Sequence, residues 1–388
     1  MSGYDWVEKG FYYNSAICQF FGRKCRACAM CVEACPHQAL QEGETTIEID
    51  PEKCDRCGDC VSICPSGALG QKIENWRPMS EYIQGHESCV FVICEESSWR
   101  KLIEPQLLSE KCLPAGVEAI PVDQIGVLSE VDFAQTFLVS RKAVVVLALG
   151  ENDIERPFAR AAEFVGHITA HLFSEQNGRG ATPLVSVIDD AETFWSRIVE
   201  IATIPECKLI PRHSLPEDEE KRQGFGNILS SWLKLVPPAS PPVVIAHPGY
   251  AGIICESEKC TLCGACANHC KVDALRVLRS DNILYHTPIA CLHCGACVAV
   301  CPEQALTLEN GLRLDPSFFS EHVLTKCEGL HCSECDRPFT SLKRSLWVSQ
   351  KLQEERGDDP IRRELLRLCP ECRTKKAFFT YEEWTSKQ

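Results

Sequence analysis

The stretch CLHCGACVAVCP, residues 291–302, contains four cysteines separated by two, two and three residues, and it ends on proline. Three further runs share this spacing, at residues 25–36, 54–65 and 260–271. The runs form two close pairs, because 18 residues separate Cys35 from Cys54 and 20 separate Cys270 from Cys291. Four copies of one spacing indicate that all their cysteines serve the same chemistry.

Each pair of runs resembles a bacterial-type ferredoxin with two 4Fe–4S clusters, and the chain as a whole resembles a polyferredoxin. In such ferredoxins the fourth cysteine of a run binds the other cluster of the pair. The resemblance therefore implies crossed ligand sets. In the first pair these are Cys25, Cys28, Cys31 and Cys64 for one cluster, and Cys54, Cys57, Cys60 and Cys35 for the other. In the second pair they are Cys260, Cys263, Cys266 and Cys301, and then Cys291, Cys294, Cys297 and Cys270.

The residue types of the runs suit iron. Thiolates are soft, anionic ligands, and Gly58, Gly264 and Gly295 would let the backbone approach a cluster closely. The alternative is zinc binding or a scaffold without clusters, and four intact runs in paired spacing argue against it.

Composition limits the class of protein. The chain has 27 cysteines, and its first 20 residues lack the basic and apolar regions of a signal peptide. No apolar run approaches the ~20 residues that span a bilayer. We therefore expect a cytoplasmic metal-binding protein without membrane insertion. The net charge of −14 argues against a nucleic-acid partner.

Residues 76–236 have a different pattern. Short apolar runs at 89–94, 116–122, 143–150 and 183–189 predict buried strands. Segments with helical character lie between and after them, at 104–113, 129–141, 156–178 and 190–202. This alternation predicts a parallel sheet covered by helices. The helix over 156–178 is expected to stop at Asn177 and Gly178, and GRGA (178–181) and GFGN (224–227) are interpreted as loops.

The order of these elements resembles the delta subunit of methyl-viologen-reducing hydrogenases, through VFVICEESS and VEAIPVDQIGVLSEVDFAQTFLVSRKAVVVLALGEND. That family carries cysteines of a 2Fe–2S site after the second of these strands, where this chain has Gly150–Asp153. Cys89, Cys94 and Cys112 are too few for such a site. The resemblance implies the fold of that subunit without its cluster.

The C-terminal segment carries a third metal signal. CSEC (332–335) and CPEC (369–372) are two knuckles separated by 33 residues, and they resemble a zinc ribbon. Cys332, Cys335, Cys369 and Cys372 would enclose one structural zinc ion. A fifth cluster that includes Cys327, or a single iron in the same four thiolates, are the alternatives. Two helices are predicted between the knuckles, from SLWVSQKL and IRRELLRL.

The predicted organisation is thus multidomain, with α+β and α/β parts. Its segments are an aromatic-rich N-terminus (1–22), a dicluster ferredoxin domain (23–75), an α/β domain (76–236), a proline-rich linker (237–250), a second dicluster domain (251–315) and a zinc-ribbon-like lobe (316–388). The N-terminal aromatic residues either pack across a cluster domain or anchor a partner.

Three functions compete. The first is a non-catalytic electron-transfer subunit, which relays single electrons between a second redox protein and a catalytic oxidoreductase subunit. That catalytic subunit would be a formate dehydrogenase, an aldehyde oxidoreductase, a hydrogenase or a heterodisulfide-reductase-like protein, and a larger hetero-oligomer is left open. The second is an enzyme with its own substrate or flavin site in the α/β domain, and the third is a cluster-assembly or redox-sensing protein. The first is preferred, because no nucleophile, base or nucleotide motif accompanies the cysteine runs.

Overall fold

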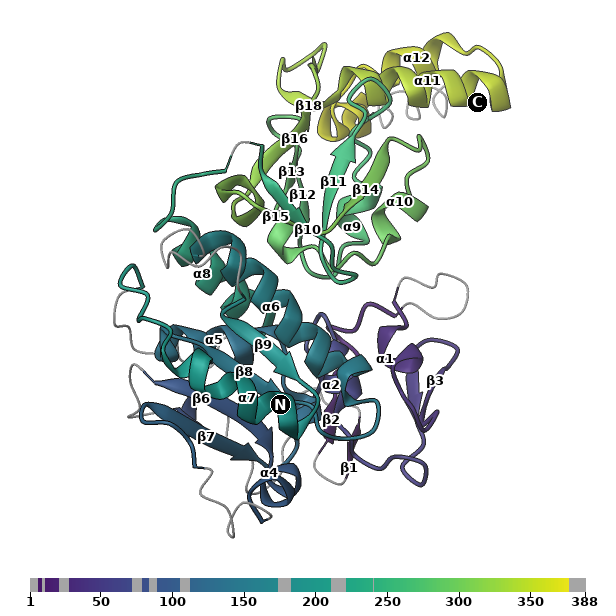
Figure 1. The fold of residues 1–388 in the computed structure, drawn as a ribbon. Helices are drawn as coiled ribbons and strands as arrows, with labels where there is room; N and C mark the ends of the chain where they lie inside the picture. The colour runs from purple at the N-terminus through teal and green to yellow at the C-terminus, as the bar shows by residue number, and fades with distance from the viewer. Residues whose placement is uncertain are drawn as a thin grey trace. The chain divides into compact units, whose positions relative to one another are not determined.

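The structure is a computed structural model. It describes residues 6–8, 11–20, 28–71, 79–83, 89–104, 112–173, 183–210, 221–239 and 241–376. The chain divides into two compact units (Figure 1). Unit 1 comprises Met1–Gly249 and Gly311–Phe319, and unit 2 comprises Tyr250–Asn310 and Ser320–Gln388. No helix in the described part of the chain is long and apolar enough to cross a bilayer.

A parallel four-stranded sheet forms the centre of unit 1, as the apolar runs predict. Its strands are β6 (Val90–Glu95), β7 (Val117–Val122), β8 (Val144–Leu147) and β9 (Val185–Ile188). They lie in the order β7-β6-β8-β9, which is a doubly wound arrangement. All four residues of β8 are buried, as expected of a strand covered on both faces.

The helices of this α/β domain are α4 (Glu96–Ile103), α5 (Glu130–Ser140), α6 (Pro157–Phe173), α7 (Ala191–Ala202) and α8 (Lys221–Leu233). Three of the predicted helices correspond to α5, α6 and α7. Most of the helix expected over 104–113, the expected stop at Asn177 and Gly178, and the GRGA segment lie outside the described residues.

The loop interpretation of GFGN is wrong, because residues 224–227 lie inside α8. Phe225 is fully buried and its ring lies 6.2 Å from that of Phe164 on α6. Further along α8, the Trp232 ring lies 5.5 Å from Phe137 of α5 and 5.7 Å from Phe173 of α6. Burial of these aromatic rings outweighs the low helix propensity of Gly224 and Gly226.

The first pair of cysteine runs is also part of unit 1. Its elements are β1 (Trp6–Glu8), β2 (Phe11–Tyr13), α1 (Met30–Glu33), β3 (Leu40–Glu42), β4 (Ile47–Ile49), α2 (Asp59–Ile63), β5 (Leu69–Gln71) and α3 (Met79–Tyr82). β2 pairs antiparallel with β1 and β5, and β3 pairs with β4. Phe11 and Tyr13 of β2 are buried, so these two aromatic residues pack within the chain.

The second pair of runs repeats this topology in unit 2. An outer ladder joins β11 (Ala251–Cys255) to β14 (Leu306–Asn310), and a hairpin joins β12 (Leu275–Leu278) to β13 (Ile283–His286). Each run continues into a short helix, α9 (Ala265–Asn268) or α10 (Ala296–Ala299). A strand from the C-terminal segment, β16 (His322–Lys326), extends the hairpin.

The C-terminal segment of unit 2 combines a hairpin with helices. Its elements are β17 (Gly329–His331), β18 (Pro338–Ser341), α11 (Leu342–Arg356) and α12 (Pro360–Leu365), and residues 370–376 are helical. The two helices predicted between the knuckles are therefore present as α11 and α12.

Residues 311–319 leave the second pair of runs and return to unit 1. There β15 (Leu312–Leu314) pairs antiparallel with β10 (Val243–Ile245), followed by the short helix η6 (Pro316–Phe319). Part of the proline-rich segment 237–250 thus forms a strand. Four of its five prolines precede the strand and Pro248 follows it, so none interrupts the ladder by its lack of a backbone donor.

Candidate metal centres

The backbone of the runs has a repeated left-handed pattern. Arg56, Leu262 and His293 have φ of 67°, 55° and 55°, and each precedes the second cysteine of its run. The glycine that follows the same cysteine is also left-handed, with φ of 88° at Gly58, 82° at Gly264 and 73° at Gly295. A third such residue lies three positions after each fourth cysteine: Gln38, Gly67, Asp273 and Gln304. Alternation of right- and left-handed residues turns successive N–H groups toward one concavity, which suits an anionic cluster.

This pattern explains why non-glycine residues occupy strained positions. A side chain in the left-handed region costs of order 1 kcal/mol or more, and the cost recurs at the same place in each of these runs. The left-handed conformation is a property of the loop that carries the cysteines, so the conformation of His293 does not indicate that its side chain is a ligand.

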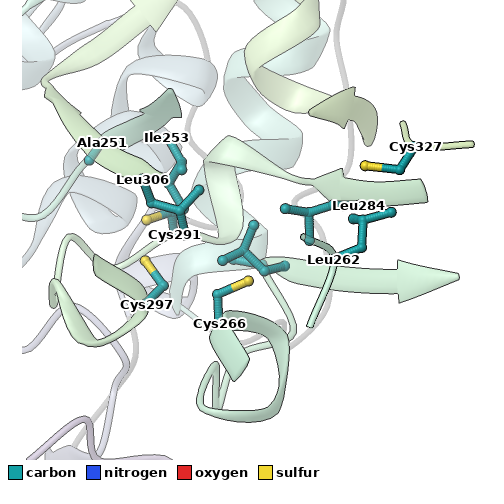
Figure 2. Close-up of a cluster of buried hydrophobic side chains, with 11 residues drawn as sticks. Ala251, Ile253, Leu262, Cys266, Leu284, Cys291, Cys297, Leu306 and Cys327 are labelled. Atoms are coloured by element: carbon teal, nitrogen blue, oxygen red, sulfur yellow. The ribbon is translucent and has the colours of Figure 1, made fainter. Parts of the chain in front are cut away.

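In unit 2, cysteines of two different runs meet in one pocket. Its walls contain Cys260, Cys263 and Cys266 of one run and Cys301 of the other, together with apolar side chains that include Leu262, Leu284 and Leu306. Cys266 also belongs to the buried cluster in Figure 2, with Cys291 and Cys297 of the fourth run. The donor set and the apolar wall fit a 4Fe–4S cluster, which needs four thiolates and exclusion of water.

The charges that act on the thiols follow the same grouping in unit 2. Burial, and then the neighbouring thiolates, raise the pKa of Cys266 to about 12; those neighbours are Cys260, Cys263 and Cys301. Burial and the thiolates of Cys291, Cys294, Cys266 and Cys270 raise the pKa of Cys297 to about 12. Cys301 therefore lies beside the run beginning at Cys260, and Cys270 lies near Cys297 of the other run.

The first pair of runs shows corresponding neighbours. Burial raises the pKa of Cys60, and the thiolates of Cys57, Cys54, Cys64 and Cys35 add to it. Burial also raises the pKa of Cys31, where the next largest contribution comes from Cys64. Cys35 thus neighbours Cys60 of the other run, and Cys64 neighbours Cys31. Cys25 lies outside the described residues.

Comparison with known families identifies the two pairs of runs. Residues 24–68 and 259–305 match the family described as the 4Fe-4S dicluster domain. The chain carries two such domains. We refer to them below as dicluster domains 1 and 2. Two ferredoxin-type dicluster domains support an iron–sulfur electron-transfer role for this protein.

Dicluster domain 1 docks on the α/β domain through its second run. Arg156, just before α6, donates hydrogen bonds from Nε to Asp59 and from Nη2 to the carbonyl oxygen of Cys57, each at 3.0 Å. Lys221, the first residue of α8, donates from Nζ to the carbonyl oxygen of Ser62 and, at 3.1 Å, to that of Cys64. The buried hydroxyl of Ser62 donates to the carbonyl oxygen of Leu128 at 2.6 Å.

Close backbone packing accompanies these bonds. Gly126 lies in η2 (Ile125–Val127), the turn that follows β7, and a Cβ there would collide with the carbonyl oxygen of Cys57. The docking surface thus comprises the loops that follow β7 and β8, at the carboxyl edge of the sheet, together with the start of α8. This edge is where doubly wound sheets bind ligands.

The C-terminal cysteines form a separate, smaller site. The Sγ atoms of Cys332, Cys335, Cys369 and Cys372 all lie within 4.8 Å of one another, and those of Cys335 and Cys369 are 3.7 Å apart. Metal–sulfur bonds of about 2.3 Å in a tetrahedron place the sulfurs about 3.8 Å apart. The spacing therefore fits one metal ion better than a cubane.

Backbone donors favour thiolate at this site. The N–H of Cys369 donates to Sγ of Cys332 at 3.3 Å, and with the N–H groups of Cys335 and Glu334 it lowers the pKa of Cys332 to about 6. One knuckle lies in the β17–β18 hairpin, and the other leads into the helix over 370–376. Only the first knuckle has the hairpin form of a ribbon.

Three of the remaining seven cysteines bear on the alternatives that the sequence left open. Cys89 and Cys94 are buried at opposite ends of one strand run, roughly 16 Å apart at the strand rise of about 3.3 Å per residue, so they cannot share a metal. Cys327, in contrast, lies beside a predicted cluster ligand, with its Sγ 3.6 Å from the carbonyl oxygen of Cys260. It is outside the compact C-terminal group.

The sequence patterns did not identify Arg156, Lys221 or Ser62 as part of the site. All three residues bind backbone carbonyl groups or buried carboxylates, and the spacing of the cysteines does not predict such contacts. The one available signal is a cation at the start of a helix, where the dipole disfavours positive charge.

Proposed function

We propose that this protein is a cytoplasmic electron-transfer subunit. Four 4Fe–4S clusters relay single electrons between a second redox protein and a catalytic oxidoreductase subunit, of the formate dehydrogenase, aldehyde oxidoreductase, hydrogenase or heterodisulfide-reductase-like type. The observation that carries the proposal is the pocket in which Cys260, Cys263 and Cys266 meet Cys301. Cysteines of two runs around one pocket are what crossed ligation requires.

The surrounding residues would support such a relay in simple ways. A bound cluster supplies a one-electron redox centre. The left-handed turns aim backbone N–H groups at it, and the apolar side chains of Leu262, Leu284 and Leu306 keep water away. Since each run contributes ligands to both clusters of its domain, the paired centres are held close together.

The docking surface favours the relay over an enzyme with its own substrate or flavin site. In a doubly wound sheet, such a site would lie at the carboxyl edge, where the loops after β7 and β8 contact Cys57 and Ser62 of dicluster domain 1. The two proposals separate in one measurement. The anaerobically purified chain should show cluster absorption without flavin, and should turn over no substrate alone.

Replacement of Cys301 tests the crossed ligand sets. We expect Cys301→Ser to alter the EPR spectrum in the same way as Cys263→Ser, because both would lose a ligand of the same cluster. Cys294→Ser is the matched comparison, since it affects the other cluster of dicluster domain 2. A Cys301→Ser spectrum that resembles that of Cys294→Ser would contradict the assignment.

The count of irons tests the relay itself. Anaerobic preparations should hold four irons for each of four clusters, sixteen in all, and the clusters should cycle reversibly. Clusters that transfer readily to apo-proteins would instead support an assembly role. For direct relay through one chain, electrons must also pass between the two dicluster domains, which we expect to appear as redistribution of electrons among all four clusters after rapid partial reduction.

We further propose that Cys332, Cys335, Cys369 and Cys372 hold a structural zinc ion. The short sulfur–sulfur distances support one ion, and borderline-soft Zn²⁺ suits four thiolates. Cys332→Ser should remove one zinc per chain and leave all four clusters in place, whereas Cys327→Ser should keep the zinc. One extra iron in place of zinc would assign a mononuclear iron site, and four extra irons would show a fifth cluster.

A further inference from the structure

The short helix α2 connects the ligands of both clusters in dicluster domain 1. Cys57 precedes α2 and Cys60 lies in it, and both belong to one proposed cluster. Cys64 follows α2 and belongs to the other proposed cluster. Cations of the α/β domain contact both ends of this segment. Arg156 binds the carbonyl oxygen of Cys57, and Lys221 binds that of Cys64.

Arg156 is held in a fixed position by two carboxylates. Its Nε and Nη1 donate to Asp59 and Asp153, each at 3.0 Å, while Nη2 binds the carbonyl oxygen of Cys57. Asp59 is buried, with a side chain only 4% exposed, and it adjoins Cys60 in the sequence. A negative charge therefore sits beside a cluster ligand, and Arg156 offsets it.

Lys221 is held in a comparable way at the other end of α2. Its Nζ lies 3.7 Å from Oε2 of Glu130 while it donates to the carbonyl oxygens of Ser62 and Cys64. Its side chain is 13% exposed and that of Glu130 7%. Solvent and salt screen such charges far less than they screen surface charges.

We propose that the α/β domain sets the reduction potentials of dicluster domain 1, with Arg156 and Lys221 as positioning residues. Reduction adds one negative charge to a cluster, so a fixed cation nearby stabilises the reduced form and a fixed carboxylate destabilises it. Arg156 acts on the cluster of Cys54, Cys57 and Cys60. Lys221 acts on the cluster that Cys64 completes. The α/β domain is then an electrostatic component of the relay as well as a support for it.

This inference rests on the proposed clusters, so its test uses the full chain loaded with iron and sulfide. Reductive titration at pH 8, followed by EPR, gives the midpoint potential of each cluster. We expect Arg156→Gln to shift the midpoint potential of one cluster to a more negative value. The expected shift is about a tenfold change in the ratio of reduced to oxidised cluster, or 59 mV for one electron. Asp59→Asn should move the same step to more positive potential.

Matched variants separate charge from packing. Arg156→Lys keeps the cation, so its midpoint potential should lie close to that of the wild-type chain. Arg160→Gln removes an exposed cation one turn along α6 and should leave every step unchanged. Lys221→Met should shift a different step to more negative potential, with Lys234→Met, an exposed position after α8, as its control.

The outcomes distinguish this inference from the proposed function. Four loaded clusters whose potentials do not change in Arg156→Gln and Asp59→Asn would overturn the electrostatic role and leave the relay intact. Shifts of the same sign in both variants would also overturn it. The two variants remove charges of opposite sign, so an electrostatic effect must shift the potential in opposite directions, whereas a disturbance of packing need not. If Arg156→Gln fails to load, then Arg156→Lys and Asp59→Asn still decide the question. A wild-type chain without four clusters would contradict the proposed function itself.

Discussion

Two cations lie at the N-terminal ends of helices, where positive charge is unfavourable. Arg156 immediately precedes α6 and Lys221 begins α8, and the positive end of a helix dipole repels both. Each is compensated by carboxylates: Asp59 and Asp153 for Arg156, and Glu130 for Lys221. Burial opposes the charge on Glu130, but the nearby Lys221 cation outweighs it, and the pKa of Glu130 falls below its ordinary value. Such local conflicts tend to mark functional positions.

The protonation of His247 should make the stability of unit 1 depend on pH. Its ring packs on Phe164, and its Nδ1 accepts a hydrogen bond from the N–H of Gly249 at 3.0 Å, which requires a neutral imidazole. Burial, with Arg222 and Lys221 nearby, lowers the pKa of His247 to about 4, although Glu130 opposes this. Because only the unfolded chain takes up this proton, stability should fall as pH decreases from about 6.5 to about 4.

The measurement is urea unfolding followed by tryptophan fluorescence at several pH values. We expect His247→Gln to reduce the pH dependence of the unfolding free energy, by up to about 1.4 kcal/mol per pH unit. His167→Gln, at an exposed position of α6, is the control. An unchanged slope in His247→Gln would show that the ring does not resist protonation in the folded protein.

At the scale of elements, helix starts organise both the cluster loops and the contacts between modules. α2, α9 and α10 each begin after a left-handed glycine. α11 begins differently, after Ser341, whose Oγ accepts a hydrogen bond from the N–H of Arg344 at 3.1 Å. The same hydroxyl donates to the carbonyl oxygen of Thr261 at 2.8 Å. One side chain thus caps α11 and fixes it to a cluster run.

Ser341→Ala should therefore cost more than the loss of an ordinary cap. A cap contributes about 1 kcal/mol, and a buried acceptor left without its donor costs about 1–3 kcal/mol more. Asp359→Ala removes the cap of α12, where Asp359 accepts from the N–H of Ile361 at 2.9 Å, together with a surface ion pair to Arg362. Denaturant unfolding of unit 2 should show the larger loss for Ser341→Ala, and equal losses would mean that the bond to Thr261 contributes nothing.

At the scale of the whole molecule, the chain passes between the two units three times. It leaves unit 1 after Gly249, returns over Gly311–Phe319, and leaves again at Ser320. The returning segment is held by the β10–β15 ladder and by Phe318, which is only 2% exposed. Gly311 has φ of 101°, and a Cβ there would lie 2.8 Å from the carbonyl oxygen of Ile245. The turn into β15 thus requires glycine.

Phe318→Ala should release this segment. Removal of a buried phenylalanine typically costs about 3–5 kcal/mol, and here the cost falls on the attachment of a nine-residue return segment. Limited proteolysis with mass spectrometry should show new cleavage near residues 311–320, with both cluster domains still loaded. Phe319→Ala, at a half-buried position, is the control. Resistance of Phe318→Ala to cleavage would show that the ladder alone holds the segment.

Local patterns along the chain identified the four cysteine runs, their pairing, the parallel sheet and the two helices between the C-terminal knuckles. These are local or periodic features, and the spacing of cysteines or apolar residues is sufficient to predict them. Long-range packing, in contrast, determines where dicluster domain 1 binds, that residues 224–227 are helical, and that residues 311–319 return to unit 1. Each of these depends on contacts between residues far apart in the chain, such as Arg156 with Cys57 or Phe225 with Phe164. Burial and hydrogen bonding with distant partners outweigh local preference there, so no pattern within a single segment could predict them.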